Sequence, residues 1–119
     1  MVAFEYCSSL ADIVLPEGVT TIGREAFRSC SSLSHIDLPE GVTTIGHGTF
    51  SGCEKLSNVT LPNSLTTIED FAFSGCNGLT ITIPDNVESM GILVFDGTGL
   101  DITIPGRFLT NMGNPIGLA

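Results

Sequence analysis

The chain has 119 residues and a formal net charge of −9, a length that suits one compact domain and is too short for two ordinary ones. Hydrophobic residues make up 42% of the sequence and charged residues only 14%, which excludes a disordered acidic tail because such tails have low hydrophobicity. Four Lys or Arg residues face thirteen Asp or Glu residues. This balance argues against binding to nucleic acid or to an anionic membrane surface.

The sequence also lacks segments that would direct it to a membrane. It has no run of about 18 apolar residues, so no part of it is expected to insert into a bilayer. Residues 1–18 have neither the basic start nor the long apolar core of a secretory signal. We therefore expect either a cytosolic protein or a piece of a longer secreted protein.

The sequence repeats itself with a period of 23 residues. The cysteines keep this spacing throughout, at Cys7, Cys30, Cys53 and Cys76. Rows of Phe, Leu and Pro follow the same period, and the last units are one or two residues shorter. So many rows with one period indicate a repeat architecture.

Each repeat begins with a short alternation of apolar and polar residues that ends in proline, as in Ile36-Asp37-Leu38-Pro39. This alternation predicts a half-buried strand. Proline fits the end of the strand because it cannot donate a further ladder hydrogen bond. The five predicted strands cover residues 13–16, 36–39, 59–62, 81–84 and 102–105.

A polar turn and a second extended piece follow in each unit. The second pieces cover residues 19–22, 42–45, 65–68 and 87–90. A glycine then breaks the chain, except in the third unit, where Glu69 takes its place. The unit closes with four residues, at 24–27, 47–50, 70–73 and 92–95, for which we expect one helical or 3₁₀ turn.

One such unit cannot bury its apolar face alone, so the units are expected to stack as a solenoid of about five coils. The rise is predicted to be one strand spacing per coil, roughly 4.8 Å. The solenoid is expected over residues 1–112, and the Gly- and Pro-containing residues 113–119 as a frayed tail. The chain starts inside a repeat with no polar cap. We therefore expect either a fragment or a chain whose exposed end coils self-associate.

The repeat reads L-x-x-I-x-L-P-x-x-V-T-x-I-G-x-x-A-F-x-x-C, most fully in residues 33–53. This pattern resembles the BspA-like class of leucine-rich repeats. The resemblance implies a right-handed leucine-rich-repeat superhelix of the β/α type, with short strands and short helical or 3₁₀ turns. It also implies a cell-surface or secreted protein associated with adhesion to host cells and extracellular-matrix proteins. The class has no catalytic residues to transfer to this chain. The sequence departs from the class at Thr49, where Ala is preferred, and at Thr98, which replaces the Cys.

The four cysteines are predicted to form a row of buried free thiols. Parallel side chains about 4.8 Å apart fit neither the Cβ separation nor the dihedral angle of a disulfide. A zinc site needs four sulfurs around one point, whereas a row spreads them over three coil rises. We therefore interpret them as small buried apolar residues.

The first strand of each unit places a row of mostly polar residues on the outward face. Because Ile13 and Leu15 are expected to point inward, Asp12 and Val14 point outward. The candidate ligand-binding residues on this face are Asp12, His35, Asp37, Asn58, Thr60, Thr82, Asp101 and Thr103. They are expected to form a ladder on one continuous sheet face, which would be concave if the solenoid curves like other leucine-rich repeats. The alternative is a plain solvated face without a ligand.

Other polar residues carry weaker signals. His35 and His47 fall on different parts of the coil and are not expected to meet, so neither a metal site nor a catalytic site is predicted there. Glu17, Glu40 and Asp85 share one turn row, which we interpret as a solvated turn rather than a cation site. No cofactor is expected.

Two functions remain open from the sequence. The first is a protein-binding repeat module of an adhesin-like protein, contacting host or matrix proteins through the outward strand face. The second is a structural spacer with no ligand of its own. Neither is an enzyme, since no convergent cluster of catalytic residues is present in the sequence.

Overall fold

The computed structural model describes residues 12–98 and 102–103, apart from the side chains of Asp12, Ile102 and Thr103. The predicted repeat start before residue 12, the candidate residue Asp101 and the predicted frayed tail at residues 113–119 lie outside these residues.

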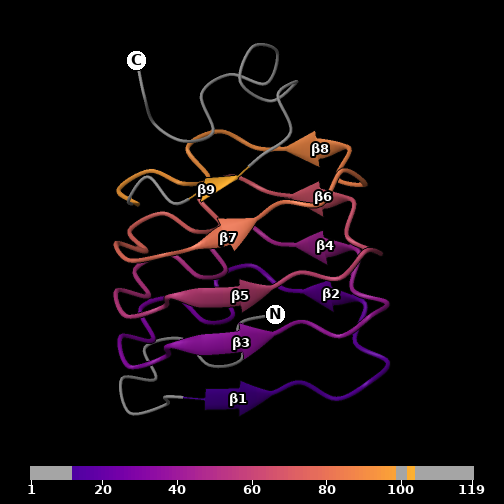
Figure 1. Cartoon of the computed structure of the whole chain (residues 1–119), viewed down its shortest axis with the longest axis horizontal. Coiled ribbons are helices and arrows are strands. Elements are labelled where there is room, and N and C mark those ends of the chain that lie inside the picture. The colour runs from indigo at the N-terminus through magenta and orange to yellow at the C-terminus, as the bar shows by residue number, and fades with distance from the viewer. Residues whose placement is uncertain (1–11, 99–101, 104–119) are drawn as a thin grey trace.

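Short parallel strands form two stacks, and two strands come from each full coil (Figure 1). The first stack holds β1 (Asp12–Val14), β3 (His35–Asp37), β5 (Asn58–Thr60), β7 (Ile81–Thr82) and β9 (Ile102–Thr103). The second stack holds β2 (Thr21–Ile22), β4 (Thr44–Ile45), β6 (Thr67–Ile68) and β8 (Ser89–Met90). Each strand overlaps a segment that was predicted to be extended and is shorter than the prediction, and β1, β3 and β5 each begin one residue earlier than predicted.

The register of the strands follows the sequence period. Ile13 pairs with Ile36, and Ile36 with Val59, so each residue lies beside its counterpart 23 positions later. Thr21 likewise pairs with Thr44, and Thr44 with Thr67. The prediction of stacked coils with like residues in contact is confirmed.

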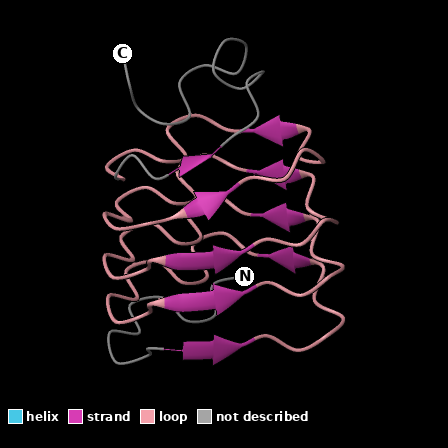
Figure 2. Cartoon of the chain, in the orientation of Figure 1, coloured by secondary structure: helices cyan, strands magenta, loops and turns pink. Residues whose placement is uncertain are grey.

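The prediction of a helical or 3₁₀ turn at the end of each unit is wrong. Within residues 12–98 and 102–103 no segment is helical, and the closing segments are turns (Figure 2). An α-helix needs consecutive right-handed residues with every N–H directed back along the chain. Glu25 and Ser29 instead have positive φ angles of 56° and 59°. The equivalent Gly48 and Gly52 have φ angles of 63° and 77°.

These turns form a third hydrogen-bonded side of the coil. Alternate N–H groups reach the next coil: the N–H of Glu25 donates to the carbonyl of His47 at 2.9 Å, and that of Phe27 to the carbonyl of Thr49 at 2.9 Å. The N–H groups in between close turns within the coil, as from Ala26 to the carbonyl of Gly23 at 3.2 Å. Every second N–H group is therefore bonded to the next coil. These groups are not available for the hydrogen bonds within one segment that a helix requires.

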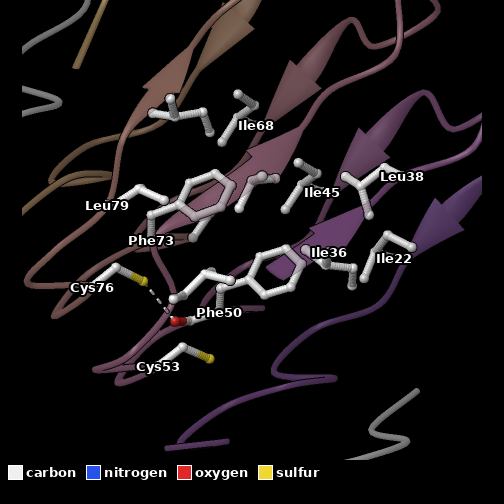
Figure 3. Packing of buried hydrophobic residues seen from close by; sticks show 14 of the residues in the cluster. Ile22, Ile36, Leu38, Ile45, Phe50, Cys53, Ile68, Phe73, Cys76 and Leu79 are labelled. Atoms are coloured by element: carbon white, nitrogen blue, oxygen red, sulfur yellow. Dashed lines mark hydrogen bonds between the residues drawn. The ribbon is translucent and has the colours of Figure 1, made fainter. Parts of the chain in front are cut away.

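A column of phenylalanines runs through the core beside these turns. The ring centroids of Phe27 and Phe50 are 5.4 Å apart, those of Phe50 and Phe73 5.3 Å, and those of Phe73 and Phe95 5.7 Å. Figure 3 shows Phe73 above Phe50, with Ile36, Ile45 and Ile68 nearby. The predicted core role of the Phe, Leu and Ile rows is confirmed for the residues described.

The cysteine row packs against the phenylalanine column. Cys30, Cys53 and Cys76 have exposed fractions of 0%, and Cys53 and Cys76 are free thiols. The Sγ of Cys76 donates to the carbonyl oxygen of Phe50 at 3.1 Å (Figure 3). The prediction of buried free thiols is confirmed for Cys53 and Cys76, and each also satisfies a backbone carbonyl of the preceding coil.

The departure of the repeat at Thr49 has a structural explanation. Thr49 is fully buried at the position that Ala26 and Ala72 hold in neighbouring coils. Its Oγ1 lies 2.9 Å from the carbonyl oxygen of Gly23 and 2.8 Å from that of Gly46. The hydroxyl group therefore has acceptors inside the core and does not leave an unsatisfied polar atom.

Candidate functional site

The first strand stack presents the predicted polar face to solvent. The side chains of His35, Asp37, Asn58, Thr60 and Thr82 are all exposed, while Ile36, Val59 and Ile81 between them are buried. Strand alternation requires this arrangement, because neighbouring residues point to opposite faces. The structure describes the backbone of Asp12 and Thr103 in β1 and β9, and Asp101 lies outside the described residues.

The structure brings four of these side chains together, two on β3 and two beside them on β5. His35 and Asp37 are two residues apart on the same face of β3, and Nε2 of His35 lies 3.4 Å from Oδ2 of Asp37. The strand register places Asp37 beside Thr60 and His35 beside Asn58. A hydrogen bond from Thr60, together with the nearby His35, lowers the pKa of the Asp37 carboxyl group from its ordinary value. Asp37 is therefore a carboxylate at neutral pH, with an imidazole beside it.

The predicted continuity of this face is interrupted. The strands β1, β3 and β5 form one sheet, and β7 and β9 form another. Between β5 and β7 the described chain has only the isolated bridge from Asn58 to Thr80. The prediction of one continuous ladder is therefore wrong at this point.

The interruption coincides with a shortening of the repeat. Leu56 and Leu79 are 23 residues apart, but Val59 and Ile81 are only 22 apart, so the missing residue falls just before β7. A shallow hollow of about 330 Å³ opens there. The side chains of Asn58, Thr60, Thr80 and Thr82 contribute to its lining.

The chemistry of the face suits contact rather than catalysis. Among its described side chains, it offers one carboxylate, one imidazole, an amide and several hydroxyl groups, all at the surface. His47 lies elsewhere, with its ring centroid 5.6 Å from that of Phe71, so the two histidines do not form a common site. Within residues 12–98 and 102–103 no three His, Cys, Asp or Glu side chains are grouped to hold a metal ion.

Sequence reasoning did not identify two features of the face. One is the pair of His35 and Asp37, although their spacing of two residues on a strand was the signal for it. The other is the place of Val14 beside Asp37, since Val14 was expected only to point outward and its side chain is 92% exposed. Val14 pairs in register with Asp37, so an apolar side chain adjoins the charged group.

Comparison with known families agrees with the stacked coils. Residues 1–114 match six copies of the BspA type leucine rich repeat region. The chain belongs to the BspA-type leucine-rich repeat family. Chains of known structure that are similar to it include bacterial leucine-rich repeat proteins. A comparison with curated protein sequences gives no significant match.

Three solved structures illustrate the relationship of this BspA-type chain to others. The pneumococcal vaccine antigen PcpA is 30% identical with a TM-score of 0.75, over 92% of this chain and 29% of that protein. A leucine-rich repeat protein from Bacteroides capillosus is 36% identical with a TM-score of 0.66, over 81% of this chain and 76% of that protein. A leucine rich cell surface protein from Faecalibacterium prausnitzii is 32% identical with a TM-score of 0.61, over 86% of this chain and 35% of that protein.

The BspA-type chain thus spans about 29% of the length of PcpA. In the part of the chain that is described, no helix has the length and apolar character needed to cross a bilayer.

Proposed function

We propose that this chain is a protein-binding repeat module of a cell-surface or secreted, adhesin-like protein. The outward face of the first strand stack would contact a host or extracellular-matrix protein. The observation that carries the proposal is the exposed group of His35, Asp37, Asn58 and Thr60, held in register on two adjacent strands. Extended faces of this kind are the usual binding surfaces of solenoid proteins.

The names of two structural neighbours support the cell-surface part of the proposal. One is a vaccine antigen and the other is described as a leucine rich cell surface protein. The acidic composition and the shallow polar face are consistent with contact between proteins rather than with catalysis. Because the described residues of the face include no Trp, Tyr or Arg, which usually dominate binding energy, we expect modest affinity for a single copy.

The competing function is a structural spacer without a ligand. Its support is the regularity of the stack, in which the residues of β1, β3 and β5 lie in register with their counterparts in the next coil. A spacer needs only the stack, whereas a binding module also needs the particular side chains around Asp37.

Binding of the full chain to immobilised collagen, laminin and fibronectin separates the two functions. We expect saturable binding to at least one of these proteins. It should weaken about fivefold to tenfold when Asp37→Asn is combined with His35→Ala, since charged contacts at an interface contribute on this scale. The control variant Glu88→Gln removes an exposed carboxylate next to the second strand stack and should leave binding unchanged.

Two outcomes would count against the proposal. Absence of binding to all three proteins by a chain with native melting behaviour would favour the spacer. Binding that is weakened equally by Glu88→Gln and by the variants on the first strand stack would mean that overall charge, and not this face, determines the interaction.

A further inference from the structure

A second hollow lies away from the strand face, at the corner where the second strand stack turns into the third side of the coil. Its volume is about 280 Å³. The residues that matter for its chemistry are His47, Glu69, Asp70, Ser89 and Gly91. None of them belongs to the face proposed above, so this corner is an independent surface.

The repeat departs from its own pattern at this corner. Glu69 occupies the position that Gly23, Gly46 and Gly91 hold in the other units. Its Oε1 accepts a hydrogen bond from the N–H of His47 at 3.1 Å. The carboxyl group therefore reaches across to the preceding coil and is held at the rim of the hollow.

Asp70 is held in a similar way on the other side. Its Oδ1 accepts a hydrogen bond from the N–H of Ile92 at 2.9 Å. Gly91 makes this possible, because a Cβ atom there would lie 2.5 Å from the backbone nitrogen of Asp70. Within the described part of the chain, neither Glu69 nor Asp70 pairs with a Lys or Arg side chain. The second oxygen of each carboxylate is thus available to a cation.

Apolar residues lie beside Asp70. Ile92 is 49% exposed, one of two large apolar side chains that stand out in this way among the described residues. Phe71 and Leu93 lie next to Asp70 and Ile92 in the sequence and are half-buried. The rings of Phe71 and His47 also make a T-shaped contact, with 5.6 Å between their centroids.

We propose that this corner binds a basic, apolar segment of a partner protein. A Lys or Arg side chain enters the hollow between Glu69 and Asp70, and a neighbouring aliphatic side chain packs on Ile92. The anchored carboxylates supply the charge complementarity, and the apolar side chain beside them supplies the area to be removed from water.

Other occupants fit the corner less well. An anionic segment would be repelled by both carboxylates. A purely apolar segment would take them out of water without a partner. A divalent cation would find two carboxylates that each already accept a backbone hydrogen bond, and no group of three ligands occurs in the described residues.

Binding of short peptides to the isotope-labelled full chain tests the proposal by nuclear magnetic resonance. The probes are two blocked pentapeptides, Ser-Leu-Arg-Leu-Ser and Ser-Leu-Glu-Leu-Ser. We expect the arginine peptide alone to shift the amide signals of Glu69, Asp70 and Ile92 at millimolar concentration, with no change at His35 or Asn58. Because the contact is partly ionic and lies at the surface, binding should weaken as salt is raised.

Variants locate the contact within the corner. Glu69→Gln and Asp70→Asn keep the oxygen that accepts the backbone hydrogen bond but lose the charge, and each should weaken binding about tenfold. Ile92→Ala should weaken it by about threefold to tenfold through the loss of apolar contact area. The control is Glu40→Gln. Glu40 also accepts a backbone hydrogen bond, from Asn63 at 3.1 Å, but lies in the turn after β3.

Several results would overturn the proposal. These are equal binding of both peptides, shifts confined to the strand face, full affinity of the Glu69→Gln and Asp70→Asn variants, or no binding of the arginine peptide at millimolar concentration. Melting temperatures of all variants, measured in parallel, identify any variant that fails to fold. If one does, Ile92→Ala and the salt dependence still decide the question. Loss of matrix-protein binding by Asp37→Asn would leave this result unaffected, so the two surfaces can fail separately.

Discussion

The Sγ atom of Cys53 lies 3.1 Å from the carbonyl oxygen of Phe27, to which it donates a hydrogen bond from one coil to the one before it. Cys76 makes the same contact with Phe50 one coil later. The thiol row therefore links successive coils without a covalent bond. It does so only while the thiols keep their protons, because a thiolate cannot donate.

The burial of Cys53 predicts a loss of stability at alkaline pH. Burial raises the pKa of the Cys53 thiol from 9.0 to about 12. The unfolded chain therefore loses this proton near pH 9, while the folded chain retains it until about pH 12. The stabilisation is complete below pH 9 and is lost as the pH rises, by about 1.4 kcal/mol for each pH unit in this window.

Urea unfolding at pH 8, 9, 10 and 11 measures this contribution. The wild-type chain should lose free energy of unfolding more steeply than the Cys53→Ser variant, since serine does not ionise in this range. The other titrating groups are common to both proteins and cancel. Parallel pH profiles for the two proteins would show that Cys53 ionises with its ordinary pKa.

Phe50 is expected to be one of the most sensitive core positions. Its ring lies between Phe27 and Phe73, with centroids 5.4 and 5.3 Å away, and its exposed fraction is 0%. Phe50→Ala should therefore lower the free energy of unfolding by about 3–5 kcal/mol. Phe50→Leu is the control that keeps most of the volume and should cost clearly less. Thermal or urea melting near the wild-type values for Phe50→Ala would mean that the column does not support the core.

Substitutions at Gly46 and Gly78 form a matched pair that tests how closely successive coils approach each other. A Cβ atom on Gly46 would lie 2.9 Å from backbone atoms of Ile22, Gly23 and Arg24, whereas one on Gly78 would meet nothing within 4 Å. Gly46→Ala should destabilise the chain by about 1–3 kcal/mol, because backbone on the neighbouring coil must move. Gly78→Ala should leave the melting temperature almost unchanged. Similar effects at both positions would contradict the close approach of the coils.

On the strand face, the Asp37 carboxyl group should titrate below its ordinary pKa. The hydrogen bond from Thr60 and the charge of His35 lower the pKa of Asp37 below its ordinary value of 3.8. The contribution of this carboxylate is therefore present above pH 3.8 and is lost as the pH falls through its lower value in the folded state. A carbon-detected titration should place the Asp37 midpoint below 3.8 in the wild type and shift it upward in Thr60→Val. An unchanged midpoint in Thr60→Val would exclude the hydrogen bond as the main cause.

The sequence was sufficient to predict the stack but not the details of its closing turns. Rows such as Cys30 and Cys53 fix the period, and the period fixes which residues become neighbours. The turn at 24–27 was misinterpreted because its local composition allows a turn of helix, whereas the N–H groups of Glu25 and Phe27 bond to the next coil. Contacts between coils are not visible in the local propensity of one segment.

The candidate site was predictable only in part. The exposure of Asp37 and Asn58 follows from strand alternation, and the sequence identified it. The gap between β5 and β7 depends on how the chain absorbs one missing residue before Ile81, which spacing alone cannot decide. The corner at Glu69 and Asp70 was noted only as a departure from glycine, because its shape arises from side chains of three different coils.

The hydrogen bonds of the third side determine how the number of repeats in such a chain can change. The N–H of Phe27 donates a hydrogen bond to the carbonyl of Thr49, 22 positions further on. The N–H of Phe50 donates in the same way to the carbonyl of Ala72. Duplication of one whole unit would therefore supply every donor with an acceptor, while insertion of a part of a unit would leave mismatched bonds on all sides. Evolution can lengthen or shorten such a protein in complete units and so adjust its reach without redesigning its interior.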